Sequence, residues 1–172
     1  MAQFLHWSVV ALVALQFVLG ISAHGMPLSL LRLKLLVWHK SVGMTVFALM
    51  LARLAWRFHS PAPALPATLR GAQRTLAHTS HWLLYALLLT MPVVGWITSS
   101  ASNLTVTWFG LFLFPNLVAP DKALADVTKQ AHITMSWLLL ALITLHVSAA
   151  FWHEFKLKDG VLGRMLPGKE TP

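Results

Sequence analysis

Two histidines near the end of the chain have a spacing that suggests joint chemistry. His132 and His146 lie 14 residues apart in an apolar stretch. In an α-helix this separation is a rise of about 21 Å, and it brings the two side chains to within about 40° of one direction. Neutral imidazole is a good axial ligand for haem iron, and two haems stacked across a membrane would need such a separation. The pair therefore predicts two ligand levels on one helix face.

Each of these histidines would need a partner at its own depth on another helix. His39 opens the second apolar stretch and matches the outer level, whereas His6 opens the first stretch and matches the inner level. His78 and His81 are competing inner partners, and as i, i+3 neighbours they share one helix face. They could equally contact a quinone or carry protons. The spacing alone does not choose among these inner partners.

The elements that position these histidines are membrane helices. The 172 residues are 57% hydrophobic and only 10% charged, which leaves too few charges to cover a soluble globule and excludes disorder and coiled coil. The absence of Cys removes disulfide frameworks, thiolate zinc sites and Cys-ligated iron–sulfur clusters. We therefore expect an integral membrane protein.

Four stretches are long and apolar enough to span a bilayer, which needs roughly 20 residues. They cover about residues 4–22, 35–56, 78–99 and 131–153. Gly25 and Pro27 mark a turn after the first, and Pro61, Pro63 and Pro66 mark an extended linker after the second. The third link, about 100–130, is aromatic and too short to span, so we expect it in the membrane interface. The prediction is one all-α domain over residues 1–172, an up-down-up-down four-helix bundle.

The basic residues near the span ends indicate the orientation. Eight lie on one side and five on the other, which favours both termini in the cytoplasm. The larger group is Arg53, Arg57, Arg70, Arg74, Lys156, Lys158, Arg164 and Lys169; the smaller is Arg32, Lys34, Lys40, Lys122 and Lys129. Acidic residues lie outside the spans or at their ends, which argues against proton transport through intramembrane carboxylates.

Residues along the second span support the ligand prediction. Gly43 lies one turn after His39, where a missing side chain would let a flat macrocycle approach, and Arg53 lies 14 residues after it. A guanidinium there suits a haem propionate, although it also suits an arginine that reaches toward the cytoplasmic surface. Gly20 and Gly95 fit ordinary close packing between membrane helices. An inner quinone or proton site could be formed by Arg57 and three histidines: His78, His81 and His153.

The chain resembles the bacterial cytochrome b561 family, small four-helix membrane proteins with two b-type haems. The resemblance rests on HW at 6–7, WHKSVG at 38–43, LAHTSHWLLY at 76–85, WFG at 108–110, AH at 131–132 and LH at 145–146. It implies ligation by the first, second and fourth helices, with two ligands on the fourth. Carried over, the ligands are His6, His39, His132 and His146, with the pairs His39–His132 outside and His6–His146 inside.

The resemblance also implies a function: electron transfer between a donor and membrane ubiquinone in the bacterial inner membrane, with superoxide as a donor of some members. The outer basic residues could draw in such a small anion, and nothing in the sequence suggests a nucleic-acid partner. Two alternatives use the same histidines. One is a haem-bearing anchor subunit for a soluble dehydrogenase or hydrogenase, and the other is a His-ligated metal-ion transporter or metalloenzyme.

Overall fold

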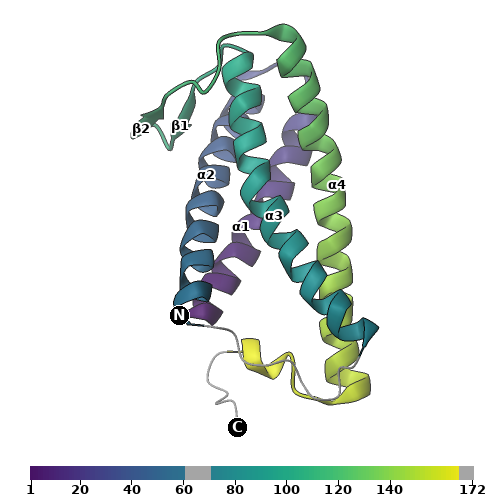
Figure 1. The fold of residues 1–172 in the computed structure, drawn as a ribbon. Coiled ribbons are helices and arrows are strands. Elements are labelled where there is room, and N and C mark those ends of the chain that lie inside the picture. Colours follow the sequence, from purple (N-terminus) through teal and green to yellow (C-terminus); the bar gives the residue numbers. More distant parts are fainter. Residues whose placement is uncertain (61–70, 167–172) are drawn as a thin grey trace.

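The computed structural model describes residues 1–60 and 71–166 and is built mainly from four long helices (Figure 1). They are α1 (Ala2–His24), α2 (Leu30–His59), α3 (Ala72–Ala101) and α4 (Lys122–Trp152). A π-helical turn, His153–Leu157, continues α4, and a short 3-10 turn follows at Gly163–Met165. The expected helical bundle is confirmed. The predicted proline linker and Arg70 and Lys169 lie outside the described residues.

The helices run up, down, up and down, and α1 packs closely on α2 as α3 does on α4 (Figure 1). All four are long and apolar enough to cross a membrane. Many large apolar side chains face outward, among them Phe4, Val18, Leu138 and Phe151. In a bilayer such an exposed apolar surface is matched by lipid, so it needs no protein partner.

The buried core lies between the levels at which the candidate histidines occur. It is formed by Val9 and Val13 of α1, Val46 and Met50 of α2 and Tyr85 of α3. Along α2, Val46 and Met50 fall after His39 and before the cytoplasmic end predicted for this helix. This mainly apolar core therefore separates the outer part of the bundle from the inner part.

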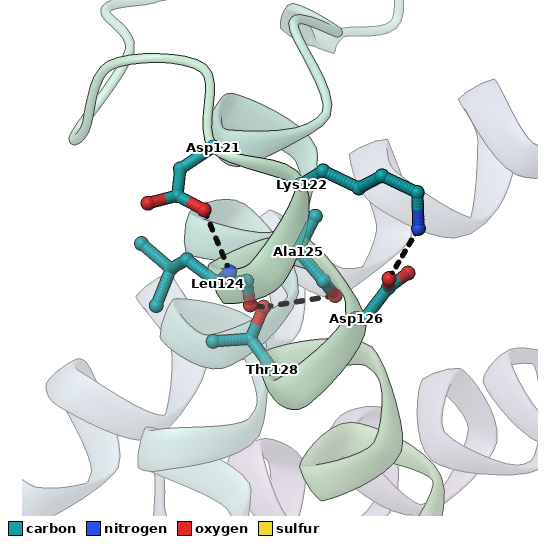
Figure 2. A network of polar contacts seen from close by, with 6 residues as sticks. All are labelled: Asp121, Lys122, Leu124, Ala125, Asp126 and Thr128. Carbon is teal, nitrogen blue, oxygen red and sulfur yellow. Dashed lines mark hydrogen bonds and ion pairs between the residues drawn. The ribbon is translucent and has the colours of Figure 1, made fainter.

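Helix α4 begins at Lys122, well before the predicted start of the fourth span near residue 131. Asp121 caps the helix, because its Oδ1 accepts a hydrogen bond from the main-chain N–H of Leu124 at 3.0 Å (Figure 2). Lys122 and Asp126 form an i, i+4 ion pair at 2.6 Å, and the Thr128 hydroxyl bonds to the Leu124 carbonyl. The first two turns of α4 are polar, so hydropathy does not mark them as part of a membrane span. The link between α3 and α4 is therefore shorter than the predicted 100–130.

The link between α3 and α4 contains an antiparallel hairpin that the sequence did not predict. Strand β1 (Val106–Trp108) pairs with β2 (Phe112–Phe114), with Thr107 opposite Leu113. The turn has positive φ at Phe109 and at Gly110 and is closed by a bond from Leu111 N to Trp108 O at 2.9 Å. Two positive φ angles in succession define the type I′ turn that suits the twist of a hairpin. The hairpin projects beside α2 at one end of the bundle (Figure 1).

A fully buried hydroxyl helps to attach this hairpin to α2. Ser41 is fully buried, and its Oγ accepts a hydrogen bond from Phe109 N at 2.9 Å while lying 2.9 Å from the carbonyls of Val37 and Thr107. Trp108 adds a bond from its Nε1 to Thr45 Oγ1 at 3.0 Å. The Ser41 of the WHKSVG motif therefore fixes the outer link, on a different helix face from His39.

We expect Ser41→Ala to lower the free energy of unfolding by about 1–3 kcal/mol, because it removes a fully buried hydroxyl and leaves the Phe109 N–H without its acceptor. Unfolding in detergent, together with limited proteolysis of the link, measures the change. Ser102→Ala is the matched control, since the Ser102 hydroxyl is exposed and bonds only to a carbonyl of its own helix at 2.7 Å. Equal effects of the two substitutions would contradict the anchoring role.

Candidate functional site

The level that the predicted orientation places on the outer side, called the outer level, contains one histidine from each helix pair. His39 of α2 and His132 of α4 are both half-buried, and their ring centroids lie 6.2 Å apart with an interplanar angle of 76°. The Nδ1 of His132 lies 3.2 Å from the main-chain oxygen of Met91 on α3. If Nδ1 donates this bond, the lone pair of Nε2 stays free for a metal.

The inner level contains three histidines. His6 of α1 and His146 of α4 have ring centroids 6.4 Å apart, at an interplanar angle of 69°. His81 of α3 lies nearer, 5.3 Å from the His146 ring. Both His6 and His81 therefore face the second histidine of α4, and the structure brings together the two inner partners that the sequence left open.

The centroid distances test whether an iron atom fits between these rings. Metal–imidazole bonds of about 2 Å, on rings whose nitrogens lie about 1.1 Å from the centroid, place two collinear axial ligands roughly 6.3 Å apart, centroid to centroid. The His39–His132 and His6–His146 pairs match this separation at 6.2 and 6.4 Å. The His81–His146 distance of 5.3 Å is about 1 Å too short. The residues therefore fit bis-histidine ligation at two levels, with His6 as the better inner partner.

Two arginines of α2 lie at the inner level and stack on aromatic rings of α3. The Arg53 guanidinium lies 5.5 Å from the centroid of Tyr85, and Arg57 lies 5.1 Å from that of Trp82. Arg53 is also close enough to interact electrostatically with His6 and His146. The aromatic rings hold both cations beside the inner histidines by cation–π contact. This places Arg53 within the neighbourhood that the sequence predicted for it.

The remaining histidines of the predicted inner site occupy different surroundings. His78 is exposed on α3, one turn before His81. His153, at the end of α4, has its Nδ1 2.6 Å from Oδ2 of Asp159, which lies in the segment that follows. This segment crosses back under α1, where the Trp7 indole donates to the carbonyl of Met165 at 2.7 Å. His78 and His153 therefore do not join the three histidines that meet at the inner level.

The glycines have different neighbours from those suggested by the sequence. A Cβ on Gly43 would lie 2.8 Å from Nε2 of Gln16, so the missing side chain makes room for this amide. A Cβ on Gly20 would lie 3.1 Å from Cε1 of His39, and one on Gly95 would lie 3.3 Å from Cε1 of His132. The sequence predicts Gly20 and Gly95 as packing residues and gives no role to Gln16. A lone amide in an apolar span was the signal that could have drawn attention to it.

Fold and site together define a class: a multi-pass helical membrane protein with facing histidines between its helices. A family model described as prokaryotic cytochrome b561 matches residues 1–168. The chain belongs to this family. Membership in this family implies that b-type haem is the cofactor and that the protein interacts with redox partners.

Individual relatives agree with this assignment. The chain is 32% identical to cytochrome b561 homolog 2 of Escherichia coli (strain K12) over 133 residues, which cover 77% of this chain and 70% of that protein. It is 30% identical to the probable superoxide oxidase CybB of Yersinia pestis over 131 residues, 76% of this chain and 74% of that protein. Cytochrome b561 homolog 1 of the same E. coli strain is 27% identical over 132 residues, 77% and 74% of the two chains.

Proposed function

We propose that this protein is a di-haem b cytochrome that transfers electrons between a donor on the outer side of the membrane and ubiquinone. The observation that carries the proposal is the pair of facing imidazoles at each of two depths, with centroid distances of 6.2 and 6.4 Å. His39 and His132 would hold the outer haem, and His6 and His146 the inner one. When bound, the haem irons supply one-electron oxidation and reduction.

The chain's own contribution is to orient ligands and exclude water. The Nδ1 contact of His132 with Met91 sets its ring, and the apolar core between the two levels keeps the space between the sites dry. Arg53, held over Tyr85, would pair with a haem propionate, and Gly43 leaves room for the Gln16 amide one turn from His39. Lower polarity around the ligands also tunes the reduction potential.

We propose superoxide as the donor. It would give up one electron and leave as dioxygen, and two such events with two protons would convert one ubiquinone to ubiquinol. The outer basic residues would raise its local concentration, with Lys40 directly beside His39. Lys122 contributes less, because Asp126 already pairs with it at 2.6 Å. The Yersinia pestis relative is itself named a probable superoxide oxidase.

The quinone and its protons are proposed to meet the inner end of the bundle, the side on which both termini would face the cytoplasm. His78, His81, Arg57 and His153 lie on the helix ends there. Asp159 orients His153 through Nδ1, so that its Nε2 is left to exchange protons with the surroundings. The short cation–π contact of Arg57 with Trp82 holds that guanidinium at the same end.

The purified protein tests the proposal directly. We expect a reduced b-type α-band and two haems per chain, reduction of both by superoxide, and reoxidation by added ubiquinone. A preparation without haem would refute the proposal, and one with a single haem would refute its two-level form. A soluble subunit that co-purifies in constant ratio would show a membrane anchor instead of a stand-alone oxidoreductase.

Ionic strength should change the rate of this reaction with superoxide. Because salt screens exposed charges over about 10 Å at 0.1 M, we expect the second-order rate constant to fall several-fold between low and physiological salt. Lys40→Gln should lower the rate at low salt and weaken the salt dependence. Lys156→Gln, at the other end of the bundle, is the control and should leave both unchanged. Stopped-flow mixing measures the rate, and a salt-independent rate would contradict electrostatic attraction.

A further inference from the structure

Each outer histidine packs against a glycine of the neighbouring helix. His132 of α4 lies against residues 91–95 of α3: its Nδ1 is 3.2 Å from Met91 O, and its ring packs on Gly95. His39 of α2 lies against α1, where its ring packs on Gly20. A histidine packed on a glycine thus occurs once in each helix pair.

Glycine is what allows this approach. A Cβ at Gly20 would lie 3.1 Å from Cε1 and 3.4 Å from Nδ1 of His39, and one at Gly95 would lie 3.3 and 3.4 Å from the same atoms of His132. Carbon atoms at their optimal separation are about 3.5–4.0 Å apart, so an alanine would push either ring away from the helix. Without a side chain at Gly95, the His132 ring reaches the Met91 carbonyl one turn earlier.

We infer that the 91–95 and 16–20 segments are seats that position the two outer imidazoles, each through a glycine, with a carbonyl added at Met91. At His132, an Nδ1–H donated to this main-chain oxygen fixes the tautomer and the ring orientation and leaves Nε2 to the iron. This inference rests on haem binding by His39 and His132 as proposed above. Gly20, Met91 and Gly95 are positioning residues, because they act through the ligands.

The two seats do not hold their histidine rings equally strongly. The His132 contact is a hydrogen bond of standard length, whereas within the described part of the chain the Nδ1 of His39 has no hydrogen bond of standard geometry. Gly43 contributes to the packing beside the 16–20 seat, because its missing side chain leaves room for the Gln16 amide one turn from His39. The His132 ring should therefore be the more strongly held of the two.

The inner level is built differently, which makes the inference specific. The glycines with a histidine neighbour in the described residues, Gly20 and Gly95, contact only the outer pair. His146 is contacted by the imidazoles of His6 and His81 instead of by a glycine. A substitution in a seat should change the outer haem alone.

The test compares Gly20→Ala and Gly95→Ala with Gly25→Ala. Gly25 ends α1 with a φ of −79°, and its added Cβ would meet nothing closer than Ile21 O at 3.8 Å. We expect both seat variants to shift the low-spin EPR signal and the reduction potential of the outer haem or to lose that haem, with Gly95→Ala showing the larger shift. The inner haem should keep its signal, and Gly25→Ala should match the unmodified protein.

The unmodified protein provides a second measurement. Hyperfine spectroscopy of the ligand nitrogens should detect a hydrogen bond at Nδ1 of His132, and Gly95→Ala should weaken it. A His132 Nδ1 without that hydrogen bond would overturn the inference, as would seat variants whose outer-haem signals match those of Gly25→Ala, or equal changes at both haems. Absence of haem from the unmodified protein would instead refute the proposed function, so the two failures are distinguishable.

Discussion

Replacing His132 by alanine should leave the protein with one haem, the inner one. The substitution removes the α4 ligand of the outer level, whose ring faces His39 at 6.2 Å. The inner pair lies about 21 Å farther along α4, behind the apolar core, and keeps its own ligands. His39→Ala should have the same outcome, because it removes the other axial ligand of the same iron. Haem counting with a difference spectrum of the reduced protein measures the loss.

His24→Ala is the matched control, because His24 is an exposed histidine at the end of α1 and should leave two haems. The converse substitution, His146→Ala, should remove the inner haem and retain the outer one. If His132→Ala and His146→Ala removed the same haem, the two-level arrangement would be wrong. If either removed both haems from a protein that still folds, the levels would not be independent.

The two levels could be predicted from the sequence because helical periodicity determines which side chains share a face. The 14-residue separation of His132 and His146 needs no tertiary information, and the order of the spans then assigns a depth to His39 and His6. The distances between the histidine rings could not be predicted in this way. The sequence could not show that His81 also faces His146, at 5.3 Å, because that depends on how α3 packs against α4.

The features missed by the sequence analysis depend on polar contacts or on helix packing. Hydropathy placed the start of the fourth helix near residue 131, whereas the cap at Asp121 and the Lys122–Asp126 pair begin it at Lys122. The hairpin depends on Ser41, whose partners are 66 and 68 residues away. Gly95 and His132 are likewise distant in sequence, so their contact follows only from the packing of α3 on α4.

Replacing His6 by alanine should remove the inner haem, whereas replacing His81 should not. The His6–His146 centroid distance of 6.4 Å accommodates an iron between two imidazoles, and the 5.3 Å distance from His81 does not. His81 instead contacts the ring of His146 from the side, as a neighbour of the ligand. Removing such a neighbour changes the polarity around the ligand, which tunes the reduction potential of a bound haem. His81→Ala should therefore retain two haems and show a shifted inner-haem potential.

The exposed His78 is the control for this comparison, since it lies on the same turn of α3 without meeting the inner pair. His78→Ala should leave both the haem count and the inner potential unchanged. Retention of the inner haem in His6→Ala together with its loss in His81→Ala would transfer the ligand role to α3. That outcome would also require the His81 and His146 rings to move apart by about 1 Å, through rotation of the side chains or a shift of α3, since a shorter centroid distance leaves no room for two metal–imidazole bonds. The pair of substitutions thus tests which of the two histidines is the inner ligand.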